Sequence, residues 1–233
     1  MKKVIICSNC TAENPFYSLT CKECNSYLRS RVPNIDLWAT ISKILYAPIT
    51  TAETLIQTDH KNFVVSLMIL AGIKLSLFVA AYYNSIFAED TNKNIFVVLI
   101  FGILFFCAAV SFISLIVTMI NKLFGLKTRF KDNLTIYVYS YLPTILLLVF
   151  LTPIYFALFG IYWFSFNPSP FMIKPTSAYV LAAFEGVFFL WSMFLSITST
   201  YAQSKSGLYS LLVGLSFNSV VVYLLLFFYK ILI

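Results

Sequence analysis

Long apolar stretches are the dominant pattern of this chain, and they predict its architecture. A helix needs roughly 20 residues to cross the hydrocarbon core of a bilayer, which is about 30 Å thick. Five stretches reach this length, and we predict transmembrane helices at residues 63–83, 95–120, 134–160, 178–200 and 208–230. Apolar and polar positions do not alternate within them, as they do in the strands of a transmembrane barrel. The expected fold is therefore an all-α polytopic membrane protein in which residues 62–233 form five spans.

Residues 32–61, which precede the first span, carry a shorter and amphipathic pattern. Apolar side chains recur there at the spacing of one helix face: Ile35, Trp38, Ile41 and Leu45. Pro33 precedes this helix, and Pro48 ends or bends it. We predict an amphipathic helix that lies in the membrane interface, with Trp38 at the depth of the lipid headgroups. The alternative is an ordinary helix that packs on the N-terminal segment.

Residues 1–31 are more polar and hold four of the five cysteines. These form two C-x-x-C pairs with ten residues between them: Cys7 with Cys10, and Cys21 with Cys24. Two such pairs close a tetrahedral four-Cys site, which is the usual arrangement of structural zinc and leaves no position for an activated water. We predict a zinc ribbon that holds Zn²⁺. Two disulfides and a redox dithiol are the alternatives, and the short paired spacing and a cytosolic location favour the metal.

The composition agrees with a membrane protein. Only 11% of the residues are charged and 60% are hydrophobic, whereas about a quarter of the residues in soluble domains are charged. The net charge is +7, but the sequence contains no run of five or more like charges. We therefore predict no nucleic-acid partner. Lys2 and Lys3 are followed by only three apolar residues, fewer than the about 7 that a signal peptide needs. We therefore expect the first span to act as the insertion signal.

Lysine and arginine residues are distributed unevenly between the two sets of connections. Twelve lie in residues 1–61, in the loop 122–132 or at Lys205, and three lie in the other connections and at the C-terminal end. Basic residues accumulate on the cytoplasmic side of membrane proteins. We therefore predict that the N-terminus and the zinc head are cytosolic and that the C-terminus lies on the outer side.

Two charged residues, Lys74 and Glu185, lie inside predicted spans. Charges within a membrane are costly and usually face a partner or a cavity. Counted from the predicted outer ends of their spans, Lys74 lies about 14 Å deep and Glu185 about 10 Å deep. We hypothesise a buried ion pair that joins the first and fourth spans. The alternative is that the aliphatic part of the Lys74 side chain lies in the membrane while its ammonium group reaches water, and that Glu185 is protonated or faces the headgroups.

Hydroxyl and amide side chains are frequent in spans three to five, among them Tyr137, Thr144, Ser196 and Asn218. Such residues mostly permit close helix packing and interhelical hydrogen bonds, and the other interpretation is a polar path for a lipid headgroup, ion or small solute. The segment 161–177 contains three prolines and several aromatic residues, and we predict an ordered, non-helical cover over the outer face. No hydrolase or nucleotide-binding motif occurs, so we expect no enzyme.

Several stretches resemble the Yip domain, a family named for Ypt/Rab-GTPase-interacting proteins. They are WATISKILYAPITTAETLI before the membrane, FGLKTRFKDNLTIYVYSYLPTILLLVF at the third span, and LWSMFLSITSTYAQSKSGLYSLLVGL at the fourth and fifth. The resemblance implies an all-helical membrane protein without known catalysis. Eukaryotic members act in vesicle trafficking and bind Rab GTPases. We assign no GTPase-contact residue, because this chain carries a cysteine-rich head in place of the family's long acidic or Pro-rich tail.

The N-terminal segment CSNCTAENPFYSLTCKECNSYL resembles the zinc-ribbon heads of many prokaryotic membrane proteins. Thr11 and Asn25 stand where these heads usually have glycine, at turns that require a left-handed backbone. Asn tolerates that conformation better than Thr. The resemblance implies a prokaryotic member of the family, in the plasma (inner) membrane.

These features predict a non-enzymatic membrane scaffold whose zinc ribbon recruits a cytosolic protein partner. The alternative is a transporter, channel or lipid-handling protein that uses the polar residues of spans three to five. A polar cavity that reaches Lys74 or Glu185 would favour the alternative, and a filled bundle would argue against it. The lipid bilayer is a partner in both cases, and homo-oligomerisation stays open.

Overall fold

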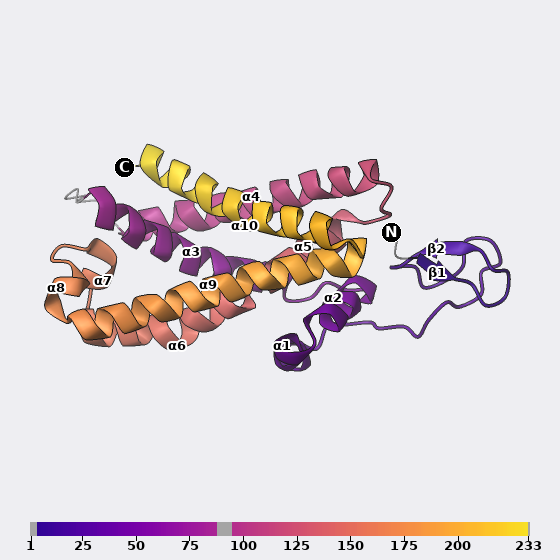
Figure 1. Cartoon of the computed structure of the whole chain (residues 1–233), viewed down its shortest axis with the longest axis horizontal. Helices are drawn as coiled ribbons and strands as arrows, with labels where there is room; N and C mark the ends of the chain where they lie inside the picture. Colours follow the sequence, from indigo (N-terminus) through magenta and orange to yellow (C-terminus); the bar gives the residue numbers. More distant parts are fainter. Residues whose placement is uncertain (1–3, 88–94, 233) are drawn as a thin grey trace.

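The computed structural model describes residues 4–87 and 95–232, and helices make up most of it (Figure 1). Five helical segments within these residues are long and apolar enough to cross a membrane: Val64–Ile86, Phe96–Leu123, Phe130–Phe159, Pro175–Ser204 and Gly207–Ile231. They lie along the long axis of the molecule, with a small head beyond one end. The predicted fold class, an all-α polytopic membrane protein with five spans and a small N-terminal head, is confirmed.

The helices that build the spans are α3 (Val64–Phe87), α4 (Ile95–Leu123), α5 (Phe130–Ser140), α6 (Leu142–Phe159), α9 (Pro175–Ser204) and α10 (Gly207–Leu232). Several extend beyond the predicted apolar windows, above all α9, which was expected at 178–200. The additional residues Ala202, Gln203 and Ser204 are buried. They stay helical because they pack inside the protein, whereas the apolar window marks only the part that suits lipid.

The third predicted span, 134–160, consists of two helices rather than one. α5 and α6 meet at Tyr141, whose φ of −82° and ψ of 4° depart from helical values. Pro143 lies in the first turn of α6, where its missing N–H removes no intrahelical hydrogen bond. Tyr141 at the break and Tyr137 one turn before it are both fully buried. The ring of Tyr137 stacks on Phe217 of α10, with 4.0 Å between the ring centroids.

Two short helices precede the membrane domain, α1 (Leu37–Tyr46) and α2 (Pro48–Gln57). The carboxylate of Asp36 accepts a hydrogen bond from the backbone N–H of Ala39 at 3.0 Å and caps α1. Pro48 begins α2 in the first turn. The predicted apolar stripe is divided, because Ile35 is buried, while Trp38 is 79% and Leu45 56% exposed. The position of Trp38 in the membrane interface stays a prediction.

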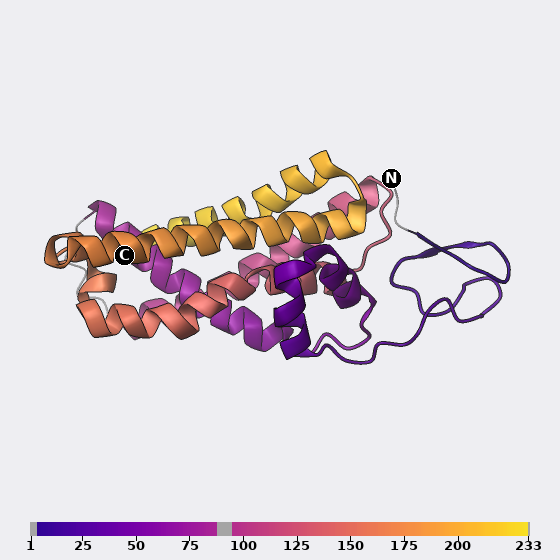
Figure 2. The same cartoon turned by 60° about the horizontal axis from the view of Figure 1, so that its bottom comes forward.

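The N-terminal head contains an antiparallel pair of strands, β1 (Val4–Ile6) and β2 (Glu13–Pro15), in which Val4 faces Pro15. An isolated bridge between Thr20 and Tyr27 closes a second hairpin. Figure 2 shows the head beyond the end of the bundle at which α1 and α2 lie. The connections after α4 and α9 also reach this end.

The opposite end of the bundle is covered by α7 (Tyr162–Ser165) and α8 (Pro170–Ile173) (Figure 1). The segment 161–177 was expected to be non-helical, and this expectation was wrong. Pro170 and Pro175 begin α8 and α9 instead of excluding helices, because proline is well suited to the first helical position. The C-terminus lies at this end, away from the head.

Candidate functional site

The four N-terminal cysteines gather around one point in the head. Their sulfur atoms all lie within 4.8 Å of one another. Cys7 Sγ and Cys24 Sγ are 3.6 Å apart, and Cys10 Sγ and Cys21 Sγ are 3.5 Å apart. A disulfide would bring two sulfurs to about 2.05 Å, whereas four sulfurs at about 2.3 Å from one tetrahedral zinc are roughly 3.8 Å apart. The cluster can therefore hold one metal ion, and its donor set suits a thiophilic one.

The two halves of the cluster repeat the same turn. Thr11 and Asn25 both adopt a φ of 58°, so the chain takes the left-handed conformation even at Thr11, where it is unfavourable. The N–H of Thr11 donates to Cys7 O at 2.9 Å, and the N–H of Asn25 donates to Cys21 O at 3.1 Å. The buried side chain of Asn14 joins the halves, since it donates to Cys21 Sγ at 3.4 Å.

The hydroxyl group of one serine forms hydrogen bonds with two of the thiols. Ser26 Oγ lies 3.1 Å from Cys7 Sγ and 3.0 Å from Cys24 Sγ. Its hydrogen bonds lower the pKa of both thiols, that of Cys24 to about 6. Although the backbone at Ala12 lowers the pKa of Cys10, the neighbouring thiols raise it to about 12. Thiols lose their protons when they bind a metal, so a metal held here would favour the thiolate form.

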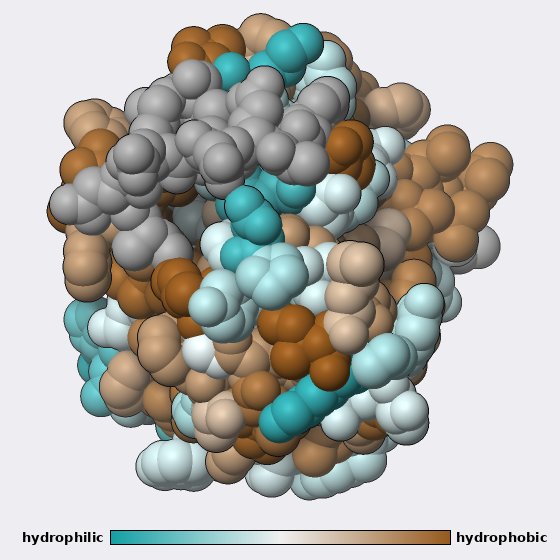
Figure 3. All heavy atoms as spheres, turned by 90° about the vertical axis from the view of Figure 1, so that its left-hand side faces the viewer, coloured by the Kyte–Doolittle hydropathy of each residue, from teal (hydrophilic) through white to brown (hydrophobic). Residues whose placement is uncertain are grey.

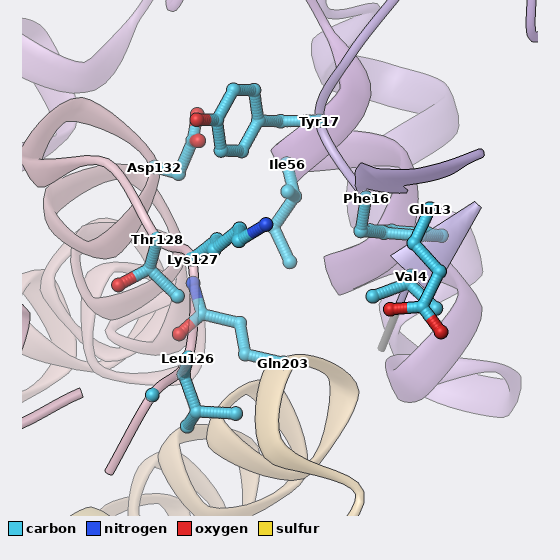
Figure 4. Close-up of a pocket in the computed structure, with 11 residues that line it drawn as sticks. Val4, Glu13, Phe16, Tyr17, Ile56, Leu126, Lys127, Thr128, Asp132 and Gln203 are labelled. Carbon is cyan, nitrogen blue, oxygen red and sulfur yellow. The ribbon is translucent and has the colours of Figure 1, made fainter. Parts of the chain in front are cut away.

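Arginine and aromatic side chains attach the head to the membrane domain. Arg29 donates to Gln57 O at the end of α2 at 2.6 Å and to Tyr17 O at 3.2 Å. The guanidinium of Arg129 lies over the ring of Tyr17, 4.0 Å from its centroid. Figure 4 shows the small cavity between the two parts, of about 80 Å³, with Phe16 and Tyr17 of the head on one side and Thr128 on the other.

A buried carboxylate lies directly beneath this attachment. Asp132 is 1% exposed and accepts from Lys61 Nζ at 3.0 Å and from Arg129 Nε at 2.7 Å. Lys61 also donates to the carbonyl groups of Leu55 and Ile56. Burial lowers the pKa of Lys61, and Asp132 offsets part of that effect. Sequence reasoning missed this network, because Lys61 and Asp132 looked like solvated loop charges and nothing in their spacing indicates contact.

The structure brings Lys74 of α3 and Glu185 of α9 together as an ion pair. Their side chains are 4% and 12% exposed. The ammonium of Lys74 also lies over the ring of Tyr155 of α6, 5.0 Å from its centroid. Lys74 is ten residues from Val64 and twelve from Ile86, the ends of its span, or about 15 Å and 18 Å. The pair therefore lies near the middle of the span and connects three helices.

A cavity of about 730 Å³ extends from this ion pair toward α7 and α8. Lys74 and Glu185 line its inner part, and aromatic side chains form much of the remaining wall. Figure 3 looks onto the end of the molecule that carries α7 and α8, where hydrophilic residues lie among hydrophobic ones. Sequence reasoning did not locate the cavity, since its wall combines α3 and α9 with the segment that was expected to cover the outer face.

The polar residues of spans three to five form contacts with one another. Tyr137 Oη lies 3.0 Å from Thr200 Oγ1, and Thr144 Oγ1 lies 2.9 Å from Ser192 Oγ. Other hydrogen bonds join α9 and α10, where Asn218 Nδ2 donates to Ser196 Oγ at 2.6 Å. These pairs match the packing role that such residues usually have.

Comparison of the chain with models of protein families, with curated proteins and with solved structures gives no match.

Proposed function

We propose that this protein is a non-enzymatic membrane adaptor, similar to the Yip domain proteins, whose zinc-bound head recruits a cytosolic protein. The observation that carries the proposal is the four-cysteine cluster in a head attached beyond one end of five membrane-spanning helices. Four protein ligands would leave zinc no open coordination position, which suits a structural rather than a catalytic role.

The attachment of the head supports an adaptor. Arg29, Tyr17 and Arg129 connect the head to α2 and to the beginning of α5, so the metal-binding module has a defined height above the bundle. Ile6 and Tyr27 on the head are 65% and 76% exposed. Exposed aromatic and aliphatic side chains on a rigid module are suitable anchors for a partner protein.

The distribution of basic residues supports a cytosolic head. The head, the loop around Lys127 and the turn at Lys205 share one end of the bundle, while the C-terminus lies at the other end. This arrangement agrees with the positive-inside bias of the sequence. The plasma membrane of a prokaryote remains the proposed location.

A variant that removes the metal ligands tests the proposal. C7S/C10S is expected to stay inserted in the membrane but to lose the proteins that copurify with the wild type. Cys107 is the matched control, because this half-buried thiol of α4 lies outside the cluster, and C107S should retain every partner. An unchanged set of copurifying proteins in C7S/C10S would refute recruitment by the head.

The cavity beside Lys74 and Glu185 favours a second candidate, a lipid-handling protein. The polar residues of spans three to five do not support a transport path, because those described above bond to one another. The cavity lies instead between the first and fourth spans.

A further inference from the structure

The adaptor function makes no use of the large cavity at the end opposite the head. Its volume of about 730 Å³ falls within the range of about 300–1,000 Å³ that is typical of pockets for small molecules. Its inner end is charged, and its walls are mainly apolar, although Asn84, Ser85 and Ser169 also line it. These two properties restrict the chemistry of an occupant.

The walls suit a hydrocarbon body. Seven aromatic side chains line the cavity: Phe78, Tyr82, Trp163, Phe164, Phe166, Phe171 and Phe189. Phe78 of α3 and Phe189 of α9 stack with 6.3 Å between their ring centroids, so they join the two helices beside the ion pair. An apolar chain that leaves the lipid can pack against such a wall through van der Waals contacts.

The inner end suits a neutral polar group. Lys74 and Glu185 have opposite charges, so the pair is neutral as a whole. A ligand with a net charge would leave one charge without compensation in a poorly solvated site, which is costly. A hydroxyl group can donate to a carboxylate oxygen and accept from an ammonium at the same time. The ammonium has three N–H donors, and the carboxylate can accept several hydrogen bonds.

One side of the cavity is formed by α9, a helix with much of its surface exposed to the membrane. Gly186 lines the cavity and is exposed on α9, and a Cβ at this position would meet no atom within 4 Å. Only 28% of the most apolar part of α9 is buried inside the protein, so this helix presents most of its surface to lipid. An occupant can therefore reach the cavity from the bilayer.

We propose that this cavity binds a neutral long-chain alcohol that enters from the lipid, with its hydroxyl at Lys74 and Glu185 and its chain along the aromatic wall. The test uses full-length protein in phosphatidylcholine vesicles. The probe is hexadecanol with a diazirine in the chain and a terminal alkyne. Two matched probes replace the hydroxyl by sulfate or by trimethylammonium.

The alcohol probe is expected to label α3, α9 and the segment 162–173, as mapped by mass spectrometry of the labelled peptides. Both charged probes should label these positions about tenfold less than the alcohol probe, as expected for an affinity that is about tenfold weaker. Equal labelling by the charged probes would overturn the neutral site. Labelling spread evenly over all lipid-facing helices would overturn the cavity as a binding site.

Two variants separate the cavity from the rest of the surface. G186F adds a large side chain to the lining of the cavity and should lose most of the labelling. G207F adds the same side chain at the beginning of α10, where a Cβ also meets nothing within 4 Å, and should label as the wild type does. K74M/E185L keeps the volume but removes the polar end, so the preference for the alcohol probe over the charged probes should disappear. Unchanged labelling in G186F, or an unchanged preference in K74M/E185L, would contradict the proposal.

Discussion

Replacement of Asp132 by asparagine should destabilise the protein more than any change at a surface ion pair. Asp132 is 1% exposed and is the shared acceptor of Lys61 and Arg129. The side chain of Lys61 is only 10% exposed. In D132N its ammonium would keep its hydrogen bonds to the carbonyl groups of Leu55 and Ile56, but it would lose its negatively charged partner. Arg129 is 32% exposed, so water would replace part of its interaction.

Loss of one partner of a buried ion pair costs about 3–5 kcal/mol, and we expect a value near the lower end because Arg129 is partly solvated. A loss of about 3 kcal/mol corresponds to a decrease in Tm of roughly 6–12 °C for a chain of this size. The assay is thermal unfolding of the purified protein in detergent, followed by intrinsic fluorescence.

The matched control is D59N. Asp59 accepts from Arg31 at 2.8 Å, but these side chains are 28% and 65% exposed, and such surface pairs contribute about 0–1 kcal/mol. A Tm of D132N that falls no further than that of D59N would refute the reasoning, because it would show that the Asp132 network is not effectively buried.

Three further outcomes are expected. The purified protein should contain one zinc per chain by elemental analysis, and C7S/C10S should contain none; a full complement of zinc in that variant would contradict the four-cysteine site. K74M alone should lower the Tm by several degrees while K74M/E185L restores it, because replacement of both partners of a buried pair is often neutral; a double variant as unstable as the single one would argue against a mutual pair. Burial lowers the pKa of Lys61, so the folded state binds fewer protons than the unfolded state in the pH range below 10.5, the ordinary pKa of lysine. The free energy of unfolding should therefore rise with pH in this range. Unfolding measurements as a function of pH should show no such rise in K61M.

The features that the sequence predicts well are those in which residue type alone restricts the structure. About 20 consecutive apolar residues have few alternatives to a membrane helix. The spacing of Cys7, Cys10, Cys21 and Cys24 is favourable for one metal site, and the structure gathers these thiols around one point. Lys74 and Glu185 stand out because charges within apolar stretches require a partner or a cavity, and the structure places them in contact.

The features that sequence reasoning missed depend on how distant segments pack. Lys61 and Asp132 lie at the ends of polar connections, where charges are normally solvated, and only the packing of α2 against α5 buries them. The exact place of the break, at Tyr141, does not follow from the sequence, because Pro143 is compatible both with a bend in one helix and with the first turn of a new one. The large cavity requires α7 and α8, and the prolines of that segment were interpreted as helix breakers instead of helix starts.

The central claim, that a metal-ordered head recruits a cytosolic protein, is tested most directly by photocrosslinking in intact cells. A photoreactive amino acid at Tyr27, which is 76% exposed on the head, is compared with one at Tyr223, which is 65% exposed on α10. The account predicts a discrete crosslinked protein from position 27, none from position 223, and loss of the adduct in C7S/C10S but not in C107S. The same adduct in C7S/C10S, or no adduct from position 27 of the wild type, would contradict it.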